Sequence, residues 1–127
     1  MAVERIQPTG LNRPTGYTHV VKVGSLAFLA GQTATDSSGN LVGVGDIEAQ
    51  TEQVYKNIKT ALASVGADFS SLVRMTTYLT RADDIEGFRR ARAKHINTDL
   101  PANTLLFVTR LANPDYLIEI EAIAALA

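Results

Sequence analysis

Two carboxylates lie two residues apart near the end of the chain, Glu119 and Glu121, within an otherwise apolar segment. Successive side chains on a β-strand point to opposite faces. On a strand these carboxylates would therefore share one face, and Ile118, Ile120 and Ala122 would share the other. Such a strand forms either a solvated surface or the wall of a polar pocket. In a pocket shielded from water, burial raises the pKa of a carboxyl group toward neutrality, which suits the group to proton transfer.

Length and composition limit the classes of protein that this chain can represent. Its 127 residues predict a single domain over 1–127 with a core of its own. The net charge of −1 provides no basic field, so we expect neither nucleic acid nor an anionic membrane as a partner. The absence of cysteine excludes disulfides and thiolate chemistry and, with only two histidines, disfavours a metal site. Because neither a signal peptide nor a membrane-length apolar run occurs, we expect a cytoplasmic protein.

The apolar pattern predicts eight elements in the order β-β-β-α-β-α-β-β. Strands are expected over 3–6, 17–23, 26–30, 72–80, 104–110 and 117–124. One helix follows a favourable N-cap at Asp46 and stops at Gly66. A capping-box pattern over 83–86 opens a second helix, which runs from Ile85 to about Ile96. This order predicts an α+β fold in which one sheet carries both helices on one face. We expect another copy of the chain to cover the opposite face.

Several segments, in the same order along the chain, resemble the sequence pattern of the Rid (reactive intermediate deaminase) family. Each motif alone is weakly specific, but their common order makes the resemblance specific, and together they span nearly the whole chain. The segments are Gly16-Tyr17, Leu29-Ala-Gly-Gln32, the helical pattern from Gln53 to Gly66 with Asn57 and Leu62, Leu72–Thr80, Pro101-Ala102 and Ile118–Ala124.

The resemblance implies a chorismate-mutase-like fold with one mixed sheet. It also implies a homotrimer built around a central β-barrel, with a cleft between each pair of neighbouring subunits. The best-known members of the family hydrolyse imines or enamines such as 2-aminoacrylate to a 2-keto acid and ammonia, without a metal or a cofactor. By resemblance, Glu119 lies near the catalytic water and Tyr17 lies at the cleft mouth, both with catalytic roles, and Gly31 binds the substrate. Of the two carboxylates, Glu121 is the less favoured candidate for a functional role.

One position departs from the family pattern where substrate binding is expected. Family members have an arginine directly after Pro-Ala that binds the substrate carboxylate, and this chain has Asn103. Arginine offers two parallel charge-assisted hydrogen bonds, whereas asparagine carries no charge. We therefore expect little activity on 2-aminoacrylate. Asn103 and Thr104 are predicted to contact substrate through neutral hydrogen bonds, and Arg92 is a candidate for the missing cation. The simpler hypothesis places Arg92 on a solvated helix face.

Three functional hypotheses follow from these residues. The first is a Rid-like enzyme that hydrolyses, tautomerises or cyclises an imine or enamine of a small nitrogen-containing metabolite. The second is a trimer that binds a small molecule or a protein without catalysis. The third, ranked last, is a ribonuclease, because the basic run over 89–94 is more typical of a solvated helix face. His19 is a candidate pocket base because it lies near Tyr17, but a surface position is the favoured interpretation, and we interpret His95 as a structural residue.

Overall fold

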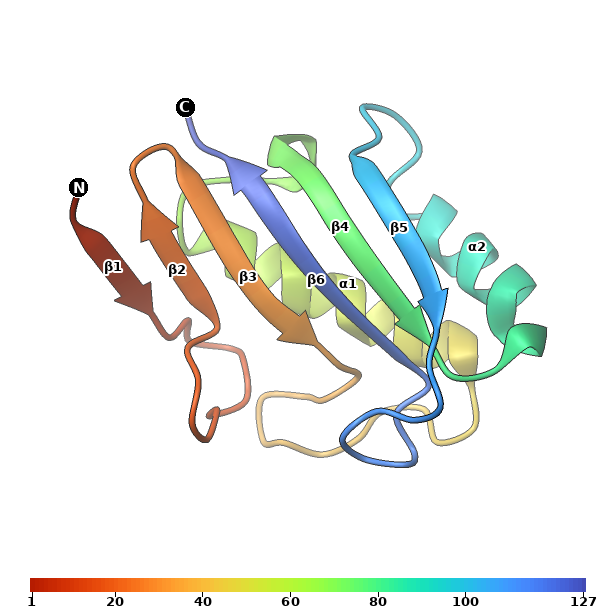
Figure 1. The fold of residues 1–127 in the computed structure, drawn as a ribbon. Coiled ribbons are helices and arrows are strands. Elements are labelled where there is room, and N and C mark those ends of the chain that lie inside the picture. Colours follow the sequence, from red (N-terminus) through yellow and green to blue (C-terminus); the bar gives the residue numbers. More distant parts are fainter.

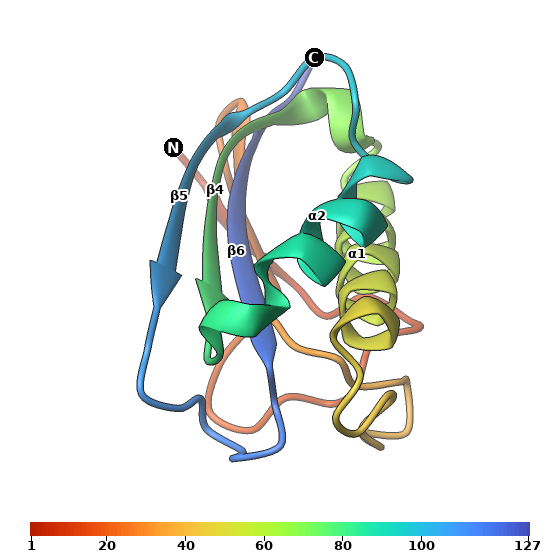
Figure 2. The same cartoon turned by 90° about the vertical axis from the view of Figure 1, so that its right-hand side faces the viewer.

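The computed structural model describes all 127 residues and contains one mixed sheet with two helices packed on one of its faces (Figures 1 and 2). The strand order is β1-β2-β3-β6-β4-β5, in which β4 and β5 run parallel and all other neighbours run antiparallel. The predicted fold class and element order are therefore confirmed. The strands are β1 (Val3–Ile6), β2 (Val20–Val23), β3 (Leu26–Gln32), β4 (Leu72–Leu79), β5 (Ala102–Phe107) and β6 (Ile118–Ala125).

The helix α1 (Ile47–Ala63) begins as the sequence predicts. Asp46 is its N-cap, and the Asp46 carboxylate accepts a hydrogen bond from the Ala49 amide at 3.1 Å. Val54, Ile58 and Leu62 recur at helical spacing and are fully buried. The apolar stripe of α1 therefore packs into the core between the helices and the sheet.

The helix α2 (Ile85–Ala93) begins at the predicted residue, but it is capped differently and ends earlier than predicted. A 3₁₀ turn over Ala82–Asp84 precedes it, and the buried Asp84 carboxylate accepts two hydrogen bonds from the Arg81 guanidinium, each at 2.8 Å. The predicted capping box over 83–86 is wrong, because no acidic side chain caps the helix. The helix also stops before Ile96, since the amides of Lys94 and His95 bond three residues back and tighten the last turn.

The strands β2, β3 and β5 also have boundaries two or three residues away from the sequence prediction. The strand β3 extends to Gln32 instead of ending at Ala30. The strand β2 starts at Val20 instead of Tyr17, because the Gln7 side chain bonds the Tyr17 carbonyl and the His19 amide in place of a strand ladder. The strand β5 lies earlier than predicted, over 102–107, because its parallel pairing with β4 ends where β4 itself ends.

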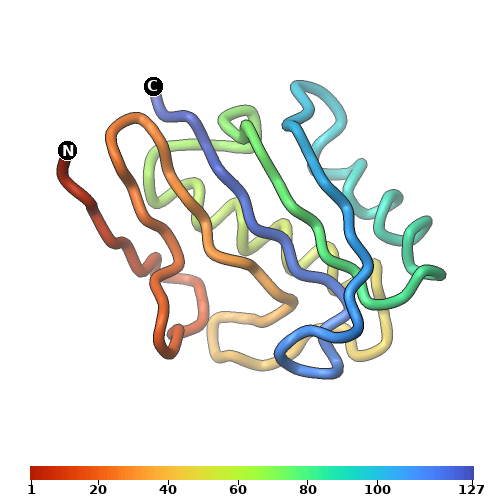
Figure 3. Tube along the Cα trace, in the orientation of Figure 1, coloured from red at the N-terminus to blue at the C-terminus, as the bar shows by residue number.

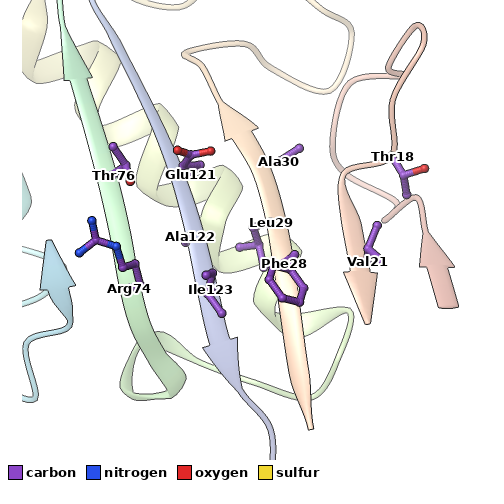
Figure 4. A pocket seen from close by; sticks show the side chains of 10 residues that line it. All are labelled: Thr18, Val21, Phe28, Leu29, Ala30, Arg74, Thr76, Glu121, Ala122 and Ile123. Atoms are coloured by element: carbon purple, nitrogen blue, oxygen red, sulfur yellow. The ribbon is translucent and has the colours of Figure 1, made fainter. Parts of the chain in front are cut away.

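The two faces of the sheet differ in chemistry. On β6, Ile118, Ile120 and Ala122 face the helices and are at most 4% exposed, whereas Glu119 and Glu121 face the other way, which confirms the predicted alternation. The open face also carries apolar side chains, including Leu26 and Phe28 of β3, which are 40% and 42% exposed. Figure 4 shows this open face, with Phe28 on β3, Glu121 on the neighbouring β6, and Arg74 and Thr76 on β4. No element of the chain covers it (Figure 2).

The loops that precede β2, follow β3 and precede β6 gather at one end of the sheet (Figure 3). They span residues 7–19, 33–46 and 108–117. Because β6 begins directly after the third loop, Glu119 lies close to this end. Neither helix combines the length and the apolar character that crossing a membrane would require.

Candidate functional site

A cleft of about 420 Å³ lies where these three loops meet the sheet. Three of the residues predicted from the sequence, Tyr17, Gly31 and Glu119, share its lining, although they come from distant parts of the chain. The other lining residues are Asn12, Ala30, Thr33, Thr35, Ala112 and Tyr116. The fold thus places the hydroxyl of Tyr17, the backbone of Gly31 and the carboxylate of Glu119 around one cleft that can hold a small metabolite.

The two carboxylates of β6 have different environments. Glu119 is half-buried, and burial, with a smaller contribution from the negative charge of Glu121, raises its pKa above the ordinary carboxyl value. Glu121 is exposed and accepts a hydrogen bond from the Tyr78 hydroxyl at 2.7 Å. A carboxylate with a raised pKa is the better proton acceptor of the two, so Glu119 is the one suited to general base chemistry.

Gly31 makes room for the Glu119 carboxylate. The pairing of β3 with β6 shifts register between Leu29 and Gln32, which places Gly31 in an irregular part of the strand. A Cβ atom added at Gly31 would lie 2.8 Å from Glu119 Cδ, closer than side-chain carbons approach one another. The Glu119 carboxylate therefore occupies the space that a side chain at position 31 would fill, and a larger residue there would have to displace it.

Replacing Gly31 by alanine is expected to displace the Glu119 carboxylate and to destabilise the fold by about 1 kcal/mol, the low end of the cost of overpacking, because the clashing atoms are the movable end of a side chain. The loss should be largely abolished in the double variant Gly31→Ala, Glu119→Ala, which removes the clashing atoms. Urea unfolding of the four proteins of this double-mutant cycle measures the coupling. Additive effects of the two substitutions would contradict the contact.

The other predicted cluster lies on the helix side of the sheet. Arg92 of α2 and Asn103 of β5 line a cavity of about 140 Å³ between these two elements, together with Tyr55, Thr77 and apolar side chains. The Arg92 guanidinium lies 5.5 Å from the centre of the Phe88 ring and takes part in none of the ion pairs of the chain. Arg92 is half-buried, so the solvated helix face expected in the simpler hypothesis does not describe its position.

The polar groups of this cavity are predominantly hydrogen-bond donors. The Asn103 side-chain oxygen accepts a hydrogen bond from the Thr77 hydroxyl at 3.1 Å, which orients the amide nitrogen of Asn103 as a free donor. Burial raises the pKa of the Tyr55 phenol above its ordinary value, and the nearby charge of Arg92 opposes this shift. The phenol therefore stays protonated at neutral pH. A cavity with a cation and two neutral donors suits an anionic group.

Thr104 lies apart from both clusters. Adjacent residues of a strand face opposite sides, so Thr104 lies on the open face while Asn103 lies on the helix side. The Thr104 hydroxyl accepts a hydrogen bond from the Arg74 guanidinium at 2.7 Å. Within one chain, the structure thus brings Tyr17, Gly31 and Glu119 together and separates them from Arg92 and Asn103.

Several cleft residues carry no motif that would have singled them out in the sequence. Asn12, Thr33, Thr35 and Tyr116 lie in loops, and only the packing of three distant loops brings them to the cleft. His19 was expected at the surface, which is wrong, since it is 2% exposed and hydrogen-bonded on both ring nitrogens. The alternation of apolar and polar residues around His19 is weak, so the sequence carries no signal that His19 is buried.

The fold and the cleft together define a small α+β protein with an acidic pocket at one end of an open sheet. A family model described as endoribonuclease L-PSP matches residues 10–126. A RutC family protein of Pyrococcus abyssi is 36% identical over 125 residues, which cover 98% of each chain. Protein HMF1 of Saccharomyces cerevisiae is 34% identical over 109 residues, covering 86% of this chain and 83% of that protein.

The fold comparison agrees with the sequence comparisons. The crystal structure of YyfA from Yersinia pestis, described as a protein of the conserved Rid family, superposes with a TM-score of 0.92 at 27% identity and covers 98% of this chain and 100% of that one. The chain belongs to the Rid family, whose family model carries the description endoribonuclease L-PSP.

Proposed function

We propose that this protein is an enzyme that acts on the imine or enamine form of a small nitrogen-containing metabolite, with hydrolysis as the favoured reaction. The observation that carries the proposal is the half-buried Glu119 carboxylate, which shares a cleft with Tyr17 and Gly31 and has a raised pKa. Family membership supports a role in deamination or small-metabolite processing. Neither a metal nor a cofactor is part of the proposed reaction.

The proposed reaction needs one group that moves protons. Glu119 accepts a proton from a water molecule while the water oxygen bonds to the imine carbon, and the nitrogen takes up a proton to give a carbinolamine. Glu119 supplies that proton to the nitrogen and so returns to its carboxylate form. It then transfers the hydroxyl proton of the carbinolamine to the nitrogen as the C–N bond breaks, so that imine and water yield a carbonyl compound and ammonia. The Tyr17 hydroxyl and the backbone at Gly31 hold the polar groups of the substrate.

We further propose that each complete site is shared by two copies of the chain in a homotrimer with its open sheet faces around a central barrel. In one chain, Arg92 and Asn103 lie on the helix side of the sheet, and β5 is separated from β6 by β4. The guanidinium therefore cannot reach the cleft that holds Glu119 in the same copy. The β5 edge of a neighbouring copy can supply it, and the uncovered apolar side chains of the open face favour such an assembly.

Sedimentation equilibrium is expected to give the mass of three chains. Phe28→Asp should shift the protein toward smaller species, because a charge would be buried where the open faces meet. Val44→Asp is the matched control, since Val44 is 71% exposed in a loop and outside the sheet. A wild-type protein that stays monomeric at micromolar concentration would contradict the shared site.

The reaction can be tested with imines that an amino-acid oxidase generates in situ from a panel of amino acids. At least one imine should be turned over, whereas most of the panel, like 2-aminoacrylate, should show little turnover, because Asn103 stands where the family pattern has a carboxylate-binding arginine. Robust 2-keto-acid production from several amino-acid imines would contradict this specialisation. If ligands bind but no imine is turned over, the protein is a binding trimer. If purified protein cleaves RNA and Glu119→Ala abolishes that cleavage, the ribonuclease hypothesis replaces the present one.

A further inference from the structure

His19 is buried directly behind the cleft, and the proposed chemistry does not use it. Its ring is 2% exposed. Its Nε2 atom lies 2.7 Å from the Asn12 carbonyl oxygen, and its Nδ1 atom lies 3.1 Å from the side-chain nitrogen of Gln32. A buried imidazole with a polar partner on each nitrogen has a fixed orientation and joins the segments that carry those partners.

The partners determine which nitrogen of His19 carries the proton. A carbonyl oxygen can only accept, so Nε2 donates to Asn12. The Gln32 amide nitrogen also donates to the Ala30 carbonyl at 3.1 Å, which fixes the amide orientation and leaves Nδ1 of His19 as an acceptor. The network is therefore fully satisfied by the neutral ring with its proton on Nε2.

The same network holds the first wall of the cleft, the loop over 7–19. Besides the bond of His19 to the Asn12 carbonyl, the Gln7 side chain donates to the Tyr17 carbonyl at 3.1 Å and accepts from the His19 amide at 3.0 Å. The rings of Tyr17 and His19 meet edge to face with their centres 5.5 Å apart. Tyr17 itself is exposed, so these contacts are what hold it in place beside the cleft.

The second wall is the irregular end of β3. Gln32 follows Gly31 directly, and its amide nitrogen spans from the Ala30 carbonyl to the His19 ring. Ala30 and Gly31 both line the cleft. A backbone hydrogen bond from the Ala30 amide to the His19 carbonyl at 2.8 Å joins the two walls at one point. The imidazole adds a second connection, between the strand segment beside the Glu119 carboxylate and the part of the loop that carries Asn12.

We propose that His19 is a positioning residue of the Glu119 cleft, whose neutral imidazole ties the loop over 7–19 to the end of β3 and so sets the place of Tyr17 relative to Glu119. Only the expected effect of His19 variants on turnover rests on the proposed function. The structural part concerns the geometry and hydration of the cleft and can be tested whether or not the protein proves to be an enzyme.

Three variants separate positioning from general stability. His19→Ala removes both hydrogen bonds. His19→Gln can restore them, since its amide nitrogen can donate to Asn12 and its amide oxygen can accept from Gln32. Val54→Ala creates a cavity in the fully buried part of α1, away from the cleft, and serves as the matched destabilised control. His19→Phe, which keeps a ring but has no polar atom, replaces the alanine variant if the latter does not fold.

The first measurement is the titration of the Glu119 carboxyl by ¹³C NMR in the full-length protein. In the wild type and in His19→Gln its pKa should stay raised, whereas in His19→Ala it should fall toward the ordinary value as water enters between the loosened walls. Val54→Ala should keep the raised pKa despite its lower stability. An unchanged Glu119 pKa in His19→Ala, or in His19→Phe where the alanine variant does not fold, would overturn the proposal.

The second measurement is turnover of the best imine found in the panel. His19→Ala should lower kcat by about tenfold to a hundredfold, the size expected when a catalytic contact is displaced by about 1 Å, and His19→Gln should recover most of the loss. An equal loss in Val54→Ala would overturn the positioning role. If the wild type turns over no imine, the proposed function fails while the NMR titration still decides the role of His19.

Discussion

Replacing Glu119 by glutamine is expected to lower kcat on the proposed imine substrate by about 10²–10⁴-fold, the usual contribution of a general base. Glutamine fills the same volume but cannot take a proton from water. Binding of a substrate analogue, measured by calorimetry, should change much less than kcat, because the carboxylate acts on the water and does not hold the substrate. The defect should therefore appear in kcat more than in KM.

Glu121→Gln provides the matched control, since Glu121 lies on the same face of the same strand two residues further on. Its carboxylate is exposed and accepts a hydrogen bond from Tyr78, so its substitution should change kcat by only a few-fold. Equal losses in the two variants would show that net negative charge matters and that Glu119 has no specific role. Full activity of Glu119→Gln would exclude it as the base.

The raised pKa of Glu119 also sets the sign of two pH effects. The base form is the active one, so kcat should fall as the pH drops through the raised pKa, above the range where an ordinary carboxyl titrates. For stability, a folded-state pKa above the unfolded value favours folding at low pH, and this contribution is lost as the pH rises through the folded-state pKa. Glu119→Gln should therefore unfold at higher urea than the wild type at neutral pH, with the difference disappearing in acid.

Replacing Arg92 by glutamine is expected to weaken binding of anionic substrates by about thirtyfold or more, which corresponds to about 2 kcal/mol. Arg92 is the half-buried cation of the cavity beside Asn103, and it forms no ion pair within the chain. Removing it therefore breaks no ion pair that stabilises the fold. The effect should appear as a higher KM, or as a higher Kd for a non-reacting carboxylate.

Arg90→Gln is the control for Arg92, because Arg90 lies on the same helix but is exposed and pairs with Glu48 at 3.3 Å. It should leave KM within about twofold, as expected for the loss of an exposed ion pair. The double variant Arg92→Gln, Asn103→Arg should recover affinity, since it returns a guanidinium to the position that the family pattern favours. Arg92→Gln with unchanged affinity for every anionic ligand would exclude Arg92 from the site.

Some features of the candidate site follow directly from local sequence rules. The alternation of Glu119 and Glu121 with apolar neighbours depends only on the two-residue period of a strand, and both carboxylates lie on the predicted face. The N-cap at Asp46 depends on one side chain and the backbone of the next turn. In both cases the interacting groups lie within a few residues, so nothing distant could change the outcome.

Other local patterns were overridden by neighbours. The acidic residues over 83–86 resemble a capping box, but Asp84 binds Arg81 instead, and the helix starts from a 3₁₀ turn. Tyr17 continues an apolar alternation, but the Gln7 side chain bonds the backbone around it and keeps it out of β2. In each case a side-chain hydrogen bond of similar strength competes with the regular structure.

The sequence by itself therefore determined the elements, their order and the facing of Glu119. The resemblance to the family points to Tyr17 and Gly31, and the departures from its pattern point to Asn103 and Arg92. Only the tertiary structure decided how these residues are grouped: Glu119 with Gly31 and Tyr17 in one cleft, and Arg92 with Asn103 in a cavity on the other side of the sheet. The burial of His19 was decided there too. The physical reason is that these contacts join loops and strands far apart in the chain, and their geometry depends on how the sheet and helices pack.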